Sequence, residues 1–429
     1  MKIAVVGGGF TGLSCALYLI ENRCEVVLYE EGKALGGLAG GINNKGWKWS
    51  LENFYHHVFT NDKEILGLAK KVGVGVLIKN PMTTSFLNKK EIRLDSPVSV
   101  LKFSGLSVWG RLRMGIGLFI LKLIPNGLFL EKYKVVGMLP RLLGKEGYFV
   151  VWEKLLRAKF GSFTGRVNMA WFWARVVKRT KNLGYFEGGF QSLADKIGEK
   201  IVELGGRIAL NSEIASIRNT ETRNDPTSPL ATFGAGKWMV NGEEFDGVVM
   251  TTPAPVTEKI LGEKINFPKI NYLWAQTMVL ELKERLINGY WMNVLENNWP
   301  FLVAVEHTNM IDKKYYGNSR IVYLGNYLPD GDKQLEMGRE DLLSLYLPYL
   351  RKVNKRFRKK WIKSVEVFRK PFAQPVFPVN YSKEVPKMKT EYMGLYLANM
   401  SMVYPFDRGT NYAVKMGSEV AKQIIFDLR

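Results

Sequence analysis

Cysteine and histidine are scarce in this chain of 429 residues. The two cysteines, Cys15 and Cys24, cannot build a disulfide framework, which argues against a small secreted scaffold and favours a cytoplasmic protein. The three histidines, His56, His57 and His307, do not combine with the cysteines into the ligand spacing of a zinc site. We therefore expect no bound metal ion.

Long apolar runs are absent as well. No uninterrupted apolar stretch reaches the roughly 18 residues that a transmembrane helix needs, and the longest candidate, 114–124, contains Lys122. The N-terminal sequence MKIAVVGGGF has one lysine and then enters a glycine-rich turn, which is not the pattern of a signal peptide. The sequence therefore predicts neither a membrane-spanning helix nor a cleaved leader.

Acidic residues are few relative to basic ones: 40 Asp and Glu face 61 Lys and Arg, a formal net charge of +21. Apolar residues make up 46% and charged residues 24%, which is ordinary for a folded protein and excludes a disordered chain. The length predicts more than one hydrophobic core. The charge favours an anionic partner, which could be nucleic acid, a membrane surface or a phosphorylated substrate; the alternative is a merely basic, well-solvated surface.

The N-terminal segment has the pattern of a dinucleotide-binding unit. A short β-branched run at 2–6 predicts a strand, residues 13–20 predict a helix and residues 25–29 predict a second strand. Between the first strand and the helix lies Gly-Gly-Gly-Phe-Thr-Gly, at 7–12. The order strand, glycine turn, helix, strand and acidic residue is that of the Rossmann-type nucleotide fold.

Each glycine of this turn has a physical role in the predicted unit. Gly7 permits the tight turn, Gly9 lets the backbone approach a pyrophosphate, and Gly12 lets helix and strand pack closely. The free N–H groups of the helix N-terminus would face the phosphates, and Glu30 would accept hydrogen bonds from the adenosine ribose. The residues expected to bind the cofactor here are Gly7, Gly9, Phe10, Thr11, Gly12, Glu30 and Glu31.

A second glycine cluster at 36–41 indicates which dinucleotide is bound. Flavoproteins place such a turn beside the first one, around the pyrophosphate and ribityl chain of FAD, whereas a nicotinamide domain has no general need for it. The motif GxGxxG occurs once, so we expect one dinucleotide site, in which Gly36, Gly37 and Leu38 contact FAD. A cysteine near the C-terminal loop at 404–414 could form a covalent thioether bond to FAD. None lies there, so we expect the FAD to be bound noncovalently.

Residues 1–41 resemble the superfamily of amine oxidases, protoporphyrinogen oxidases and phytoene desaturases. Lys33 and Leu38 stand near the places where that family usually carries arginines. The resemblance implies an α/β fold with a Rossmann-like FAD-binding domain, a discontinuous α+β substrate domain and a helical insertion. The implied boundaries are 1–75, 184–265 and 386–429 for the FAD-binding domain, 76–183 for the helical substrate or membrane-docking region, and 266–385 for a substrate domain with a β-sheet and a basic helix.

Two later segments carry the same resemblance. Residues 184–193 lead into a predicted helix and then a predicted strand at 207–217, where such flavoproteins return to the FAD domain. A strand at 394–398 is followed by Asn399, where the family has an acid, and by a helix that starts near 409–412 and would aim its N-terminus at the flavin. By the resemblance, the FAD contacts in these segments are Ile214, Thr251, Asn399, Asp407, Gly409, Thr410, Asn411 and Tyr412; Asp407 can also be the helix N-cap.

Three residues are candidates for catalysis. His56 and His57 stand together among aromatic residues, where an imidazole could act as a base, position the substrate or be structural. Arg408, beside the predicted flavin helix, could hold an anionic substrate or tune the flavin. His57, Phe59 and the two residues after it also resemble the H-x-F-H-T loop of UDP-galactopyranose mutases, although the second histidine of that loop is missing.

Basic residues gather in two segments outside the cofactor motifs. Residues 100–160 alternate apolar stretches with Lys and Arg, which is typical of an interfacial membrane helix and equally of a substrate-domain core with solvated ends. Arg175, in an aromatic cluster, needs an anionic partner. Residues 350–363 hold eight basic residues and no acid, which predicts a solvated helix face; no nucleic-acid fold signature accompanies them, so we expect no nucleic-acid partner.

Together these patterns predict an FAD-dependent oxidoreductase that acts on a large apolar or lipid-linked substrate with an anionic group. The first alternative is a redox-neutral enzyme similar to UDP-galactopyranose mutase that acts on a nucleotide sugar. The second alternative is a noncatalytic flavin-binding protein associated with a membrane. We expect a cytoplasmic protein, with peripheral attachment to the anionic inner face of a membrane as the alternative location.

Overall fold

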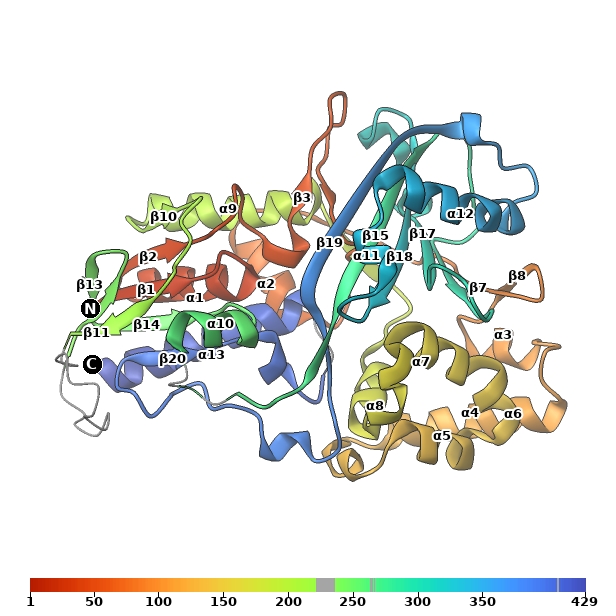
Figure 1. Ribbon diagram of the computed structural model, residues 1–429, viewed down its shortest axis with the longest axis horizontal. Coiled ribbons are helices and arrows are strands. Elements are labelled where there is room, and N and C mark those ends of the chain that lie inside the picture. The colour runs from red at the N-terminus through yellow and green to blue at the C-terminus, as the bar shows by residue number, and fades with distance from the viewer. Residues whose placement is uncertain (221–235, 263–264, 266, 407–408) are drawn as a thin grey trace.

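The computed structural model describes residues 1–220, 236–262, 265, 267–406 and 409–429. Figure 1 shows an elongated molecule in which a five-stranded sheet occupies one end, while a second sheet and a group of helices occupy the other. Both chain termini lie at the end that holds the five-stranded sheet (Figure 1).

The five-stranded sheet is parallel throughout and draws its strands from separated parts of the chain. In spatial order it contains β10 (Arg207–Ala209), β2 (Glu25–Tyr29), β1 (Lys2–Val6), β14 (Gly247–Met250) and β20 (Leu395–Leu397). The helices that lie against it are α1 (Phe10–Glu21), α9 (Gly189–Glu203), α10 (Ala254–Leu261) and α13 (Thr410–Leu428). Central strand β1 is almost fully buried, as expected when helices cover both faces of a parallel sheet. The predicted Rossmann-like α/β class is confirmed.

The strand predicted at 207–217 is interrupted. Its first part is β10 in the parallel sheet, whereas its last residue begins β11 (Ile217–Asn219) in a separate sheet. That sheet is antiparallel and also contains β12 (Trp238–Val240) and β13 (Glu243–Phe245). Asn211 between the two strands has a positive φ of 52°, which breaks the extended backbone and redirects the chain.

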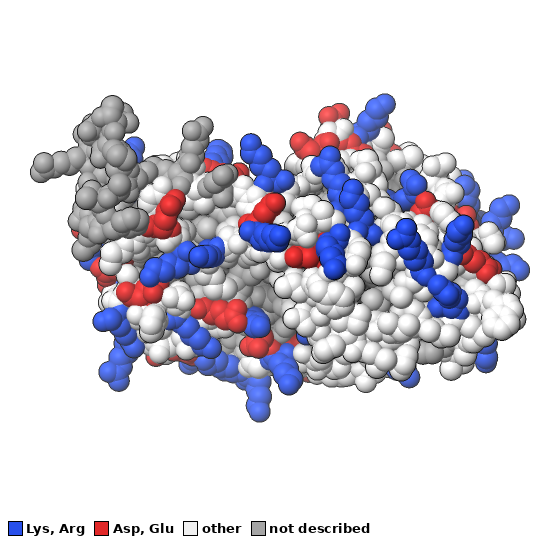
Figure 2. All heavy atoms as spheres, turned by 90° about the horizontal axis from the view of Figure 1, so that it is seen from below, with Lys and Arg blue, Asp and Glu red and all other residues white. Residues whose placement is uncertain are grey.

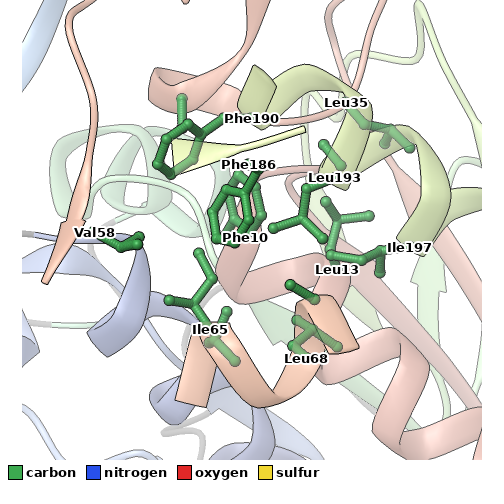
Figure 3. Close-up of a cluster of buried hydrophobic side chains, with 14 of the residues drawn as sticks. Phe10, Leu13, Leu35, Val58, Ile65, Leu68, Phe186, Phe190, Leu193 and Ile197 are labelled. Atoms are coloured by element: carbon green, nitrogen blue, oxygen red, sulfur yellow. The ribbon is translucent and has the colours of Figure 1, made fainter. Parts of the chain in front are cut away.

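A compact apolar cluster lies behind the first glycine turn (Figure 3). It joins Phe10 and Leu13 of α1 to Phe190 and Leu193 of α9, with Ile65 from α2 (Lys63–Lys71) on the other side. The remaining short strands of this region are β3 (Gly41–Ile42), β4 (Leu51–Glu52), β5 (Val58–Phe59), β6 (Val76–Lys79) and β9 (Leu183–Phe186). The cluster therefore fixes the glycine turn against elements that come from three parts of the sequence.

The second sheet has seven strands and is antiparallel except between β16 and β7. In order it contains β19 (Ile362–Val376), β15 (Asn271–Leu282), β18 (Arg320–Leu328), β17 (Val303–Glu306), β16 (Trp291–Val294), β7 (Thr83–Leu87) and β8 (Lys90–Arg93). The helices α11 (Lys333–Glu336) and α12 (Arg339–Val353) follow β18. The hairpin β7–β8 comes from the range 76–183 that was predicted as helical, so the sheet takes strands from both sides of that boundary.

The predicted basic helix over 350–363 is wrong. Helix α12 ends at Val353, the chain then turns, and β19 starts at Ile362. Phe357 and Trp361 explain the turn, because Phe357 is buried completely against the second sheet and the two rings contact each other edge to face. Burial of an apolar ring between basic residues overrides the helical pattern.

Residues 97–178 form the helical region. It contains α3 (Pro97–Leu101), α4 (Val108–Leu123), α5 (Val135–Leu143), α6 (Lys145–Gly147), α7 (Glu153–Phe160) and α8 (Met169–Lys178). Trp171 of α8 is buried in the core of this region, together with Leu139 and Leu143 of α5. Within the described residues, no helix is long and apolar enough to cross a membrane.

Helix α13 crosses α1 at Gly417. A Cβ added to Gly417 would lie 2.2 Å from the carbonyl oxygen of Thr11, and the Ser14 hydroxyl donates a hydrogen bond of 2.8 Å to the carbonyl of Val414. Only a glycine therefore allows the two helix backbones to approach so closely. This contact sets the position of the α13 N-terminus.

We predict that Gly417→Ala lowers the free energy of unfolding by about 1–3 kcal/mol, because the added methyl group forces the two helices apart. Gly115→Ala is the matched control, since Gly115 lies in the middle of α4 with nothing within 4 Å of an added Cβ. Urea unfolding of the three proteins measures the difference. Equal stability of the Gly417 variant and the wild type would contradict the close crossing.

Candidate functional site

Two glycine turns touch each other backbone to backbone at the carboxyl end of β1. Gly7 and Gly36 both have a positive φ, 110° and 108°, and the Gly36 N–H donates a 2.9 Å hydrogen bond to the carbonyl of Gly8. A Cβ on Gly37 would lie 3.2 Å from Gly9 Cα. A Cβ on Gly12 would lie 1.9 Å from the Gly7 carbonyl oxygen, so the predicted roles of Gly7 and Gly12 are confirmed.

Glu30 and Thr251 brace the first turn. The Glu30 carboxylate accepts hydrogen bonds from the N–H groups of Gly8, at 2.7 Å, and Gly32, at 2.8 Å. The Thr251 hydroxyl, at the end of β14, lies within hydrogen-bond distance of the Val6 and Gly7 carbonyls, at 2.9 and 3.1 Å. Glu30 therefore stands beside the turn as predicted and keeps further lone pairs for a ribose, whereas Glu31 is exposed.

The surrounding groups fit an FAD. Within the part of the chain that the structure describes, no side chain caps the N-terminus of α1 or of α13, and neither first turn carries an acid, so both positive helix ends are suited to an anionic ligand. A Cβ on Gly9 would meet no atom closer than Gly37 Cα at 4.0 Å, which leaves an open backbone cradle. Asn399 follows β20 and is 2% exposed, and its Nδ2 has no hydrogen-bond partner among the described residues. A buried donor without a partner is costly and indicates a missing acceptor such as a ribityl or phosphate oxygen.

Several predicted contacts have another role in the fold. The Phe10 side chain lies in the apolar core (Figure 3), so only its backbone could face a ligand. Asn411 is used to cap α2, because its Oδ1 accepts from the N–H groups of Glu64 and Ile65. Tyr412 stacks on Phe406 with ring centroids 4.9 Å apart.

The other predicted contacts divide by burial. Leu38, Thr11 and Thr410 are half-buried, Gly409 is exposed, and Ile214 is buried in a third apolar cluster. The predicted residues Asp407 and Arg408 lie outside the described residues.

The two neighbouring histidines take different environments. His56 Nδ1 lies 2.5 Å from the Phe54 carbonyl, with its ring 5.4 Å from that of Phe190. His57 is surrounded by aromatic rings, of which Trp291 is 5.8 Å away between centroids, and its Nδ1 lies 3.3 Å from the Tyr290 hydroxyl. The two imidazole rings therefore lie in different surroundings. His57 packs against Tyr290 and Trp291, at the start of β16, whereas His56 packs against Phe190 of α9.

Desolvation lowers the pKa of His57 to about 3, and the nearby Arg179, His56 and Arg175 act in the same direction. Burial raises the pKa of Tyr290, so the phenol keeps its proton and can donate to Nδ1 of His57. His57 is therefore a neutral imidazole near pH 7. It is suited to hydrogen bonding and positioning rather than to carrying a charge.

A buried polar network that the sequence did not reveal centres on Glu52. Its carboxylate accepts hydrogen bonds from the Phe190 N–H, at 2.7 Å, and from the Tyr185 hydroxyl, at 2.9 and 3.0 Å. The Tyr316 hydroxyl lies 3.5 Å from that of Tyr185 and 2.8 Å from His307 Nε2. The network joins β4 and β9 to the second sheet. In the sequence, the one feature that could have pointed to this network is an acidic residue shortly before the two histidines.

We predict that Glu52→Gln stabilises the protein at high pH. Desolvation raises the pKa of Glu52 from 4.5 to about 7, so wild-type stability falls as pH rises between these values, because the unfolded state has already lost the proton. The variant should gain up to about 3 kcal/mol relative to wild type at pH 8 and little at pH 4. Thermal unfolding across pH measures this, with exposed Glu213→Gln as the control. Parallel pH profiles of variant and wild type would contradict a raised pKa.

Solved structures share this fold over the whole chain. The structure of a reduced UDP-galactopyranose mutase aligns with a TM-score of 0.76 and 14% identity, and covers 99% of this chain and 95% of that chain. An oxidoreductase from Methanosarcina mazei aligns with a TM-score of 0.71 and 18% identity, and covers 99% and 100%. At these identities the likeness is one of fold.

Sequence comparison identifies the family. Zeta-carotene desaturase of Capsicum annuum is 33% identical over 91 residues, which cover 21% of this chain and only 15% of that protein. The model of the family described as flavin-containing amine oxidoreductase matches residues 10–425. Since this match covers nearly the whole chain, the protein belongs to the flavin-containing amine oxidoreductases and is a flavin oxidoreductase.

Proposed function

We propose that the protein binds FAD noncovalently and oxidises a large apolar or lipid-linked substrate that it meets at an anionic membrane surface. The observation that carries this proposal is an exposed apolar face on the helical region. FAD, when bound, would accept a hydride from a C–H bond of the substrate, and the protein would position the two partners and exclude water. The short match to a zeta-carotene desaturase agrees with an apolar substrate.

Helix α4 is apolar on two opposite faces. Gly110, Met114, Gly117 and Leu121 are buried in the helical core. Trp109, which is 80% exposed, stands on the other face, where an ordinary surface helix would carry polar groups. The exposed large apolar side chains of the helical region, here together called the apolar face, are Val98, Leu101, Val108, Trp109, Leu112, Ile116, Phe119, Ile120, Leu123, Phe129, Tyr133 and Phe149. A patch of this size marks an interaction surface.

Most of the charged residues around the apolar face are basic. Figure 2 shows a broad uncharged surface over the helical region with Lys and Arg side chains around it. Between positions 96 and 152 the sequence carries eight basic residues, Lys102, Arg111, Arg113, Lys122, Lys132, Lys134, Arg141 and Lys145. Its two acids are hydrogen-bonded within the protein, Glu131 to Ser382 and Glu146 to Ser107. An apolar face with a basic rim is complementary to an anionic bilayer.

Helix α8 connects this face to the candidate site. The Trp173 indole N–H donates a 3.1 Å hydrogen bond to the Ile124 carbonyl just after α4, and its ring lies 6.3 Å from that of Phe406. Phe406 in turn stacks on Tyr412 of α13. A substrate that enters from the apolar face therefore meets, along one helix, the segment that starts the predicted flavin helix.

A redox-neutral activity similar to that of UDP-galactopyranose mutase is the second candidate function. His57 and Phe59 lie on a loop whose sequence resembles that of the mutases, and the two folds align along their length. That enzyme would need reduced flavin and would leave it reduced. The desolvated, neutral His57 is compatible with either reaction.

We predict that Trp109→Glu lowers partition onto anionic vesicles about tenfold or more, because it places a charge in the exposed apolar face that would enter the bilayer. Phe426→Glu is the matched control, since Phe426 is 83% exposed but lies at the end of α13, outside the apolar face. Sedimentation with phosphatidylglycerol–phosphatidylcholine vesicles measures the partition, and wild-type binding should weaken as salt rises. Equal loss in both variants, or no wild-type binding, would contradict a membrane face.

We predict that an apolar substrate with an allylic C–H bond reduces the flavin of the holoenzyme without air, and that His57→Phe slows this step by about 10²-fold with FAD still bound. Stopped-flow absorbance measures the rate, and the wild-type rate should show no titration near the ordinary histidine pKa, because His57 is already neutral there. Turnover of a nucleotide sugar only by the pre-reduced enzyme would favour the mutase. Flavin binding with neither activity would favour a noncatalytic protein.

A further inference from the structure

Three cations gather at the C-terminal end of α8. Arg175, Lys178 and Arg179 follow the helical spacing i, i+3 and i+4, which places them on one side of the chain. The residues that follow the histidine pair run beside this end: Asn61 Nδ2 donates to the Lys178 carbonyl at 3.3 Å, and the Thr60 N–H donates to the Thr180 hydroxyl at 3.3 Å.

The same end of α8 also faces the start of the predicted flavin helix. Lys178 Nζ lies 4.9 Å from the ring centroid of Phe406 and 5.9 Å from that of Tyr412. Arg175 stacks over Trp171 at 5.2 Å, which holds its guanidinium against the helical core. The cations thus stand between the His57 loop and the loop that precedes α13.

Arg179 is the first residue after α8. It is exposed, yet desolvation together with the charge of Arg175 lowers its pKa to about 10. The same two arginines contribute to the lowered pKa of His57. Among the described residues, the charge that contributes to this pKa shift is that of Arg175.

The helix dipole explains part of this arrangement. Cations in the last turn of α8 interact favourably with its C-terminal carbonyls, which accounts for Arg175 and Lys178. It does not account for Arg179, which follows the helix and stands next to a like charge in a desolvated place. Several cations gathered beside a ligand site are typical of a place that binds an anion.

We propose that Arg175, Lys178 and Arg179 bind the anionic head of the substrate, a phosphate or carboxylate carried by an apolar chain. This assignment rests on the proposed function, because it places the apolar part of the substrate along α8 and the head at its end. Guanidinium groups bind such oxygens with paired hydrogen bonds, and the ammonium group of Lys178 adds a third positive charge.

The test is a titration of FAD-loaded protein, followed by the change in flavin absorbance. The ligands are dodecyl phosphate, dodecanoate, dodecanol and inorganic phosphate. We expect dodecyl phosphate to bind about tenfold or more tightly than dodecanol, and Arg179→Gln to abolish that preference while dodecanol binding stays unchanged. Dodecanoate shows whether a single negative charge suffices, and weak binding of inorganic phosphate shows that the chain is needed. Lys181→Gln is the control, since Lys181 is exposed two positions beyond Arg179.

The outcomes separate this proposal from the proposed function. Equal binding of dodecyl phosphate and dodecanol to the wild type would overturn the anion subsite and leave the apolar substrate standing. Failure of all chain ligands to perturb the flavin would overturn both. A preference for phosphate that survives in Arg179→Gln and in Arg179→Lys would place the anion elsewhere, and the flavin spectrum of each variant reports that it is folded.

Discussion

The contact between the two glycine turns is the constraint on which the rest of this structure depends. A Cβ on Gly12 would lie 1.9 Å from the Gly7 carbonyl oxygen, which excludes a side chain there, and a Cβ on Gly37 would lie 3.2 Å from Gly9 Cα. The two turns come together because Gly7, Gly36 and Gly37 adopt a positive φ. A pyrophosphate bound there would lie against backbone N–H groups and the uncapped end of α1. The parallel sheet and the apolar cluster of Figure 3 hold the turns in place from behind.

A second requirement is the alignment of the two halves of the molecule. The close crossing of α1 and α13 at Gly417 places one uncapped helix end, and the buried network around Glu52 fastens the nucleotide-binding half to the second sheet. Both are costly to build: the crossing tolerates no side chain, and Glu52 is a carboxyl group held away from water. Each contact also holds parts of the site in fixed positions: the crossing fixes the N-terminus of α13, and the Glu52 network fixes the second sheet.

The apolar face, helix α8 and the three cations form one continuous arrangement. The apolar face and its basic rim suit a bilayer, α8 leads inward from it, and Arg175, Lys178 and Arg179 end beside His57 and Tyr412. This order matches a chain-like molecule with an anionic head. The proposed membrane face and the proposed anion subsite would together account for part of the net charge of +21.

The sequence by itself determined the features that depend on local spacing. The strand, glycine turn, helix and acid at the N-terminus, the second glycine turn, and the start of α13 were all predictable, because the pattern of glycines and apolar residues fixes each of them locally. The tertiary structure decided the rest. It ended the basic helix at Val353 because Phe357 is buried, gave Asn411 to the cap of α2, and separated His56 from His57. It also shifted the pKa values of Arg179 and Glu52. Desolvation and contacts between distant segments cause such shifts, and the neighbouring residues in the sequence do not reveal them.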